Sequence, residues 1–293
     1  MSERPQTWHP APRATTTVLP KGATDCHCHV FGPKARFPYA AHNNEGPADA
    51  PKEALFALHD RMGIDRCVIV QSGVHGFDNS VVVDAMKARP GRYLGVALAP
   101  PDLSDGALGY LRDNGFRAIR YNYMKHLTPG AGPDDLRALA PRLAERDMHL
   151  QIHMESGLIA DMAPVLANLP VTVVIDHFGR IDSSLGMTHA HYQSLLRLLD
   201  HDNLWCKVSG TERSSRSEPP YDDAVPFAAG VVARHPDRVV WGTDWPHPNY
   251  RADPPDDGDL FDLIPRIAPA PYLVQALMVD NPTRLYNFEK VTK

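Results

Sequence analysis

The first apolar run of the sequence carries alternating residues of types that bind metals. Asp25, His27 and His29 lie two residues apart, with Cys26 and Cys28 between them. Alternate residues of a β-strand point to the same face, so we expect the aspartate and both histidines on one face and the cysteines on the other. Two imidazoles on one face can bind a divalent cation, but histidines in such a pair also serve as simple hydrogen-bonding groups. The pair therefore indicates a metal site only if further ligands lie nearby.

Three later strand-like runs end in residues that can complete such a site. His153 lies near the end of HLQIHMES, His177 follows VTVVID, and Asp244 follows RVVWGT. In a barrel the carboxyl ends of all strands meet at one mouth, so these residues become neighbours. Three imidazoles and a carboxylate suit Zn²⁺, with Mn²⁺, Fe²⁺ and Co²⁺ as alternatives and one position open for water. Other histidines, among them His59 and His149, are interpreted as solvated surface residues.

Three arginines lie in or near the same runs. Arg120 ends GFRAIR, Arg180 comes three residues after His177, and Arg213 lies in the polar segment GTERSSRSEPPYDD. A guanidinium presents a planar fork of donors that matches a carboxylate, so three of them at one mouth would suit a dianionic substrate. Because most arginines are solvated, Arg213 in a loop is a weaker candidate than the other two.

The elements that must position these residues are read from the hydrophobic pattern. Eight short apolar runs rich in β-branched residues predict strands over 24–30, 66–71, 93–99, 116–121, 149–154, 171–176, 204–208 and 238–241. Segments of helical period separate them, for example 52–63, 134–147, 189–202 and 222–236. Alternating strands and helices require parallel pairing with right-handed crossovers. We therefore predict an α/β fold, a (β/α)8 TIM barrel, with an open doubly wound sheet as the alternative.

Length and composition fit one large domain with a small-molecule partner. We expect an extended N-terminal arm over 1–22 and a single barrel domain over 23–293. The net charge of −5 argues against a nucleic-acid partner. No apolar stretch approaches the roughly 18 residues that span a bilayer, and the N-terminus lacks the apolar region of a signal peptide. With the four cysteines interpreted as buried thiols, these features predict a cytoplasmic protein and leave a homo-oligomer open.

Several segments resemble the amidohydrolase superfamily. They are TDCHCHVFGP, VIVQSGVHGFDN, GFRAIRYNY, IDHFGR and WGTDWPHPN, and the likeness runs from about residue 20 to about residue 288. Within this superfamily, in its amidohydrolase-2 branch, the chain is most similar to the group of 2-pyrone-4,6-dicarboxylate lactonases. The resemblance implies a barrel enzyme that hydrolyses a lactone carrying carboxylates.

The resemblance also implies roles for particular residues. The aspartate after the eighth strand handles the proton of the attacking water, while arginines hold the acidic groups of the substrate. The expected catalytic residues are Asp244 and His177. The expected substrate-binding residues are His75, Arg120, His126, Arg180, Arg213 and Glu45.

The chain departs from those lactonases at three positions that bear on a metal. The lactonases are metal-independent and carry a tyrosine in place of His153, a tyrosine in place of Glu45 and an arginine in place of His126. A histidine at position 153 restores the ligand set of metal-dependent relatives, namely aminocarboxymuconate-type decarboxylases and muconolactone hydrolases. By that resemblance one divalent metal, Zn²⁺ or Mn²⁺, is bound by His27, His29, His153 and Asp244, while His177 orients the water. A metal-free mechanism, with the histidine at 153 as a substrate contact, is the alternative.

The expected reaction is attack of water on a lactone carbonyl. The expected substrate is a 2-pyrone-dicarboxylate or a muconolactone-like compound bearing carboxylate or sulfonate groups, as in the catabolism of aromatic compounds. Alternatives on the same scaffold are a metal-dependent decarboxylase, a sugar-acid lactone isomerase and a binding protein without catalytic activity.

Overall fold

Eight parallel strands form the centre of the molecule. The computed structural model describes residues 6–41, 46–125, 130–250 and 253–289. The strands are β1 (Thr24–Cys28), β2 (Arg66–Val70), β3 (Tyr93–Leu98), β4 (Phe116–Tyr123), β5 (His149–Met154), β6 (Val173–Ile175), β7 (Leu204–Lys207) and β8 (Val239–Val240). Each lies within or overlaps one of the eight predicted runs, and they are hydrogen-bonded in sequence order from β1 to β8.

Backbone hydrogen bonds between the two ends of this sheet close it into a barrel. The N–H of Cys26 donates to the carbonyl of Trp241 at 2.9 Å, and the N–H of Asp244 donates to the carbonyl of His27 at 2.7 Å. Because β1 thus meets the segment that follows β8, the fold is a (β/α)8 barrel, as predicted, and the open-sheet alternative is wrong.

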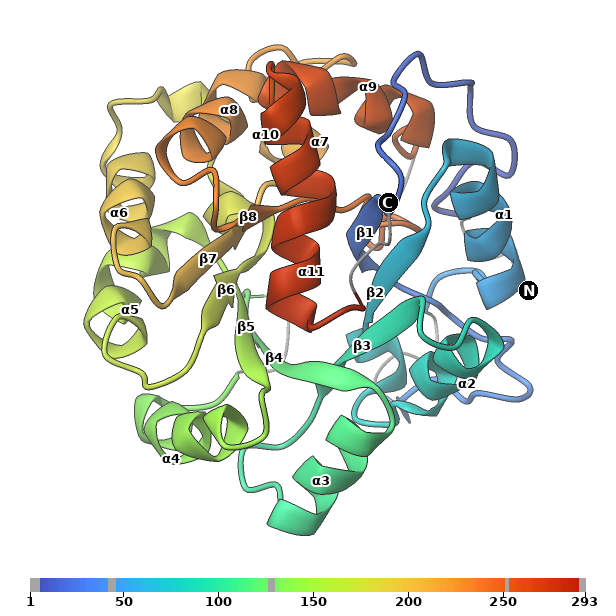
Figure 1. Cartoon of the computed structure of the whole chain (residues 1–293), viewed down its shortest axis with the longest axis vertical. Coiled ribbons are helices and arrows are strands. Elements are labelled where there is room, and N and C mark those ends of the chain that lie inside the picture. The colour runs from blue at the N-terminus through green and yellow to red at the C-terminus, as the bar shows by residue number, and fades with distance from the viewer. Residues whose placement is uncertain (1–5, 42–45, 126–129, 251–252, 290–293) are drawn as a thin grey trace.

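Helices surround the strands as an outer layer (Figure 1). The α-helices are α1 (Lys52–Met62), α2 (Ser80–Ala88), α3 (Asp105–Asp113), α4 (Pro133–Ala144), α5 (Ile159–Leu166), α6 (Ala190–Leu199), α7 (Thr211–Ser214), α8 (Val225–Arg234), α9 (Asp257–Ile267), α10 (Pro271–Gln275) and α11 (Asn281–Tyr286). Shorter 3₁₀ turns are η2 (Gly73–His75), η3 (Ser156–Leu158), η4 (Asp176–Arg180) and η5 (Ser183–Leu185), and η6 (Ala276–Asp280) is a π-helical turn. None of the helices in the described part of the chain is long and apolar enough to cross a membrane.

The apolar core has two layers, one inside the barrel and one between strands and helices. Inside, Val68, Val96, Val174 and Val240 pack with Tyr286 from the end of α11. Figure 1 shows α11 lying across the end of the barrel that faces the viewer. The C-terminal segment therefore helps to fill this end, and the carboxyl ends of the strands are left to build a site at the other end.

A bulge in β1 changes which residues share a face. Asp25 pairs with Cys67 and Cys28 pairs with Ile69, so β1 has one residue more than β2 between these pairs. Cys26 consequently lies in the core inside the barrel, whereas Cys28 lies in the outer layer. The predicted strict alternation of this strand is therefore wrong, although the four cysteines are buried and free, as predicted.

The same bulge separates Asp25 from the histidines with which it was expected to share a face. Its carboxylate accepts hydrogen bonds from His59 Nε2 at 3.2 Å and from the Thr243 hydroxyl at 2.6 Å. His59 lies on α1 and also contacts the hydroxyl of Tyr93 through Nδ1 at 2.6 Å. Both His59 and His149 are buried, so their interpretation as solvated surface residues is wrong.

Residues 6–22 contain no helix or strand and pack against the segment after β8 and against α9. The indole rings of Trp8 and Trp245 lie 5.3 Å apart, measured between centroids. Asp262 on α9 accepts hydrogen bonds from the hydroxyl groups of Thr15, Thr16 and Thr17. These contacts tie the N-terminal segment to the loop that carries Asp244.

Candidate active site

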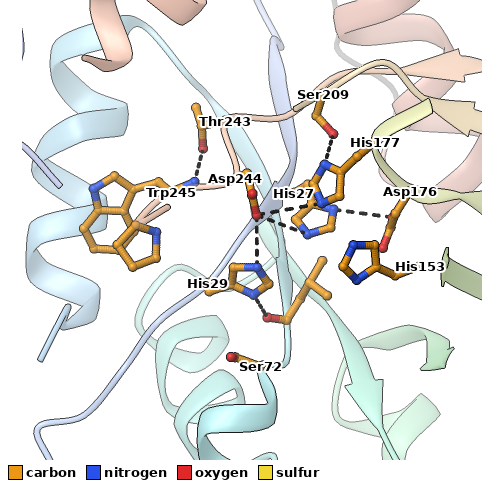
Figure 2. A network of polar contacts seen from close by, with 12 residues as sticks. His27, His29, Ser72, His153, Asp176, His177, Ser209, Thr243, Asp244 and Trp245 are labelled. Carbon is orange, nitrogen blue, oxygen red and sulfur yellow. Dashed lines mark hydrogen bonds and ion pairs between the residues drawn. The ribbon is translucent and has the colours of Figure 1, made fainter. Parts of the chain in front are cut away.

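Three imidazole nitrogens converge on one carboxylate oxygen at the carboxyl ends of the strands. Asp244 Oδ1 lies 3.2 Å from His29 Nε2, 3.7 Å from His27 Nε2 and 3.9 Å from His177 Nε2. All four side chains are buried. Figure 2 shows the three rings arranged around the Asp244 carboxylate. The closure of the barrel thus brings together residues that are more than 200 positions apart in sequence, as the sequence pattern predicted.

The backbone is strained at two of these residues. His177 has a φ of +50° and Asp244 has a φ of +60°, in the left-handed region that non-glycine residues seldom adopt. Each such residue costs on the order of 1–2 kcal/mol and persists only where surrounding contacts impose it. Strain at two converging side chains is typical of a functional site, because folding alone does not require it.

The donor set suits a divalent metal ion. His27, His177 and Asp244 each offer an atom within 4.8 Å of the others. Two ligands bound about 2.1 Å from one ion are themselves separated by roughly 3–4 Å, which is the range of separations around Asp244 Oδ1. The Nε2 atom of His27 is also buried without a hydrogen-bond partner among the described residues. The residues present therefore fit such an ion, and His177 belongs to this group by position.

Burial keeps His27 and His177 in the neutral form that metal binding requires. Burial, together with the nearby Lys207 ammonium, lowers the pKa of His27 to about 4. Burial also holds the pKa of His177 well below its usual range. Burial alone would raise the pKa of Asp244, but the Arg213 guanidinium and the imidazoles outweigh it and hold that pKa well below the usual value.

His153 approaches the same group from β5. Its Nδ1 atom lies 3.1 Å from Asn122 Oδ1, and its Nε2 atom is buried without a hydrogen-bond partner among the described residues. The ring centroid lies 5.4 Å from that of His177. Figure 2 shows His153 beside His27 and His177, on the side of the site away from Trp245.

The three expected arginines differ in how far their charges are already paired. Arg213, on α7, donates through Nε to Asp244 Oδ2, and Arg120 donates through Nε to Asp176 Oδ2 at 2.8 Å. Arg180 forms no hydrogen bond or ion pair with any residue that the structure describes, although burial and the nearby Arg213 lower its pKa to about 10. A mostly buried guanidinium without an internal partner is poised to bind an anion from solution.

Of the other expected substrate contacts, His75 is buried and does not line the cavity, and two lie outside the described residues. His75 lies on η2, where its Nδ1 atom contacts the carbonyl of Pro38 at 3.1 Å and its ring packs against Tyr39. Burial lowers the pKa of His75. Glu45 and His126 lie outside the residues that the structure describes.

A cavity of about 1460 Å³ opens above the converging side chains. Its lining includes seven of the expected residues, namely His29, Arg120, His153, His177, Arg180, Arg213 and Asp244. It also includes polar residues that sequence reasoning missed, namely Thr7, Ser72, Asn122, Glu212 and Tyr250. Thr7 lies in the expected N-terminal arm, and no local sequence pattern marks it as a site residue.

Two further missed residues lie beneath the cavity. Asp176 and Lys207 are buried inside the barrel next to His27. Each is a charged residue at the end of an apolar strand, in VVIDH and LWCKV. A charge in that position is seldom tolerated without a partner, and this was the available signal.

The barrel fold, with histidines and an aspartate at the strand ends, defines a class of protein, and sequence comparison identifies that class. The chain belongs to the amidohydrolase family, whose model matches residues 24–288.

Particular relatives narrow the comparison. The chain is 43% identical to a 2-pyrone-4,6-dicarboxylate hydrolase of Comamonas testosteroni, covering 97% of this chain and 96% of that protein. It is 38% identical to a 4-sulfomuconolactone hydrolase of Rhizobium radiobacter, covering 92% of this chain and 91% of that protein. A crystal structure of an Agrobacterium tumefaciens protein in its apo form superposes with a TM-score of 0.83 at 26% identity, covering 95% of this chain and 100% of the other.

Proposed function

We propose that the protein is a metal-assisted lactone hydrolase that opens a lactone ring bearing carboxylate or sulfonate groups. The observation that carries the proposal is the convergence of three imidazole Nε2 atoms on Asp244 Oδ1. The guanidinium of Arg180, which forms no ion pair within the described part of the chain, lines the same cavity. The curated relatives named above, which act on lactones with acidic substituents, support the same reaction class.

The proposed ligands of the metal are His27, His29, His153 and Asp244, and the geometry adds His177 to this set. We propose Zn²⁺ or Mn²⁺, since imidazole and carboxylate donors suit both. A divalent ion held there would supply a water of lowered pKa and polarise the lactone carbonyl.

Asp244 is the proposed general base and acid. Its low pKa keeps the carboxylate ionised at neutral pH, and Arg213 fixes the orientation of that carboxylate through Oδ2. The other oxygen, Oδ1, faces the imidazoles and is placed to take a proton from the attacking water. The same carboxyl group then returns the proton to the leaving alkoxide as the ring opens.

Arg180 is the proposed anchor for the acidic substituent of the substrate. Its guanidinium makes no hydrogen bond or ion pair with the described residues, and it lines the same cavity as Asp244. Holding a carboxylate or sulfonate there fixes the angle at which water meets the lactone carbonyl. We propose muconolactone-like compounds and 2-pyrone-dicarboxylates as the substrates to test first.

The proposal is tested by incubating the purified protein with 2-pyrone-4,6-dicarboxylate, 4-sulfomuconolactone and an uncharged sugar lactone, followed by mass spectrometry of the products. We expect one of the anionic lactones to gain one water, and the uncharged lactone to react poorly. An Asp244→Asn variant should lower kcat about 10²–10⁴-fold, the usual contribution of a general base. Loss of carbon dioxide from the substrate, or unchanged turnover by the variant, would contradict the proposal.

A further inference from the structure

A network of buried charges lies directly beneath His27, inside the barrel. Its centre is Asp176, the first residue of η4, which is fully buried. Asp176 Oδ2 accepts hydrogen bonds from Arg120 Nε at 2.8 Å and from Gln151 Nε2 at 2.9 Å. Asp176 Oδ1 has no hydrogen-bond donor within normal distance among the described residues, and it lies 3.4 Å from His27 Nδ1 and 3.6 Å from Lys207 Nζ. One carboxylate thus joins side chains from β1, β4, β5 and β7.

Lys207 is the other group that faces the same nitrogen of His27. Its ammonium donates to the carbonyl of Cys26 at 2.9 Å and to Gln151 Oε1 at 2.7 Å. The third hydrogen of the ammonium has two candidate acceptors, His27 Nδ1 at 3.4 Å and Asp176 Oδ1 at 3.6 Å. The two choices leave the imidazole in opposite tautomers, because a neutral ring carries only one N–H.

The two tautomers differ in what His27 offers to the active site. If Lys207 donates to Nδ1, the ring proton lies on Nε2 and points at the Asp244 group, where it blocks metal binding. If Nδ1 instead donates to Asp176, Nε2 carries a lone pair. Only in the second arrangement does the ring donate a hydrogen to Asp176 Oδ1. The third hydrogen of the Lys207 ammonium is then donated to the same oxygen. A buried carboxylate oxygen without donors is costly, so this arrangement is favoured.

We propose that Asp176 is a positioning residue that fixes the tautomer of His27, with the proton on Nδ1 and the lone pair of Nε2 directed at Asp244 and His177. Arg120 and Gln151 hold Asp176 in the required orientation, and Lys207 balances its charge. The role of Arg120 in this network is additional to its expected contact with substrate. The effect on metal affinity rests on the proposed function, whereas the tautomer does not.

The tautomer of the neighbouring proposed ligand, His29, is fixed in the same way. His29 Nδ1 lies 2.7 Å from the carbonyl oxygen of Val70, which can only accept, so that nitrogen must carry a proton. An acceptor behind each ring therefore directs both Nε2 atoms to the same place. Partners of this kind behind metal-bound histidines typically change metal affinity 10–100-fold when removed.

The tautomer can be measured directly in the metal-free protein by long-range ¹H–¹⁵N NMR on protein with ¹⁵N-labelled histidine, with the His27 signals assigned by a His27→Gln variant. We expect a protonated Nδ1 and an unprotonated Nε2 at neutral pH. In Asp176→Asn, the amide oxygen should keep the position that Arg120 and Gln151 bind, so its NH₂ group faces His27 Nδ1. That donor should move the ring proton to Nε2 and weaken Zn²⁺ binding about 10–100-fold.

Ser209→Ala is the matched control, because it removes the partner of His177 Nδ1, at 3.0 Å, and should leave the His27 tautomer unchanged. Lys207→Met should also keep the wild-type tautomer, and it tests the network if Asp176→Asn does not fold. A wild-type His27 protonated on Nε2, or a tautomer that stays the same in a folded Asp176→Asn protein, overturns the proposal. A wild-type protein that never binds metal but shows the expected tautomer refutes the metal and not the role of Asp176.

Discussion

His29 Nε2 and Asp244 Oδ1 lie 3.2 Å apart although neither atom has a hydrogen to share in its ordinary neutral or ionised form. The other nitrogen of His29 must donate to the carbonyl of Val70, so Nε2 of the neutral ring carries a lone pair. At this hydrogen-bond distance, a lone pair facing a carboxylate is repulsive unless a cation lies between them. That cation is either a proton, which makes His29 an imidazolium, or a metal ion, and the two cases define a metal-free and a metal-assisted site.

Arg180→Met should separate binding from stability. Because the guanidinium of Arg180 is mostly buried without a described partner, the apolar replacement should leave the melting temperature unchanged or higher. The loss of a charge-assisted hydrogen bond to substrate should raise KM about 10–100-fold with a smaller effect on kcat. Steady-state kinetics and thermal unfolding check both parts.

The control for that variant is Arg137→Met, on the exposed side of α4, where Arg137 pairs with Asp134 at 2.7 Å. It should change neither KM nor the melting temperature by a measurable amount. An unchanged KM in the Arg180 variant would remove this residue from the substrate site.

Gly242→Ala should disturb the site through the backbone of β1. A methyl group at this position would lie 2.4 Å from the backbone nitrogen of His27 and 2.7 Å from its Cβ atom. Neither atom can move without shifting the barrel wall, so we expect a loss of about 2 kcal/mol or more in the free energy of unfolding, together with reduced turnover. Denaturant unfolding measures the first and initial rates the second.

Gly109→Ala is the matched substitution. Gly109 lies within α3 with no atom near its added methyl group, so alanine should stabilise the helix by up to about 1 kcal/mol. If the two variants were equally stable, contact with β1 would not be what prevents a larger residue at position 242.

Asp223 should contribute a pH-dependent part of the stability. Burial raises its pKa, but hydrogen bonds from the Arg216 backbone and from Ser183 and Ser215 outweigh this and lower the pKa from 3.8 to about 2. A carboxyl group whose folded pKa is depressed stabilises the fold above its unfolded pKa, and this contribution is lost as the pH falls from about 4 to about 2. Because Asp223 is partly exposed, solvent screening reduces this contribution, and we expect about 1 kcal/mol or less.

Urea unfolding measured at pH values from about 5 to about 2 checks this prediction, because this range spans the unfolded and folded pKa values of Asp223. Asp223→Asn should remove part of the loss of stability on acidification. Asp237→Asn, at an exposed position, should not. Parallel pH profiles for wild type and Asp223→Asn would contradict the assignment.

The strands and the converging residues could be predicted because their signals are local. Apolar runs with β-branched residues mark each strand, and a barrel brings the residues at the strand ends to one mouth. This reasoning placed His177 and Asp244 together without any contact information. The role of each residue at the mouth is a separate question, which the sequence pattern does not answer.

Features that depend on register or on partners from several strands could not be predicted. The bulge between Asp25 and Cys28 reverses the face of part of β1, and only its pairing with β2 reveals it. The role of Asp176 and Lys207 depends on buried partners from other strands, since Asp176 lies near both Lys207 and Arg120. The pairing of Arg213 with Asp244 likewise arises from α7, a single turn within a segment that reads as a polar loop.

Elemental analysis of protein purified without chelators, from medium supplied with zinc and manganese, tests the central claim most directly. The account predicts about one equivalent of a divalent metal in the wild-type protein and much less in a folded His27→Asn variant, because His27 Nε2 faces Asp244 in the proposed ligand group. Wild-type protein that contains no metal yet opens anionic lactones would contradict the account, and the cation between His29 and Asp244 would then be a proton.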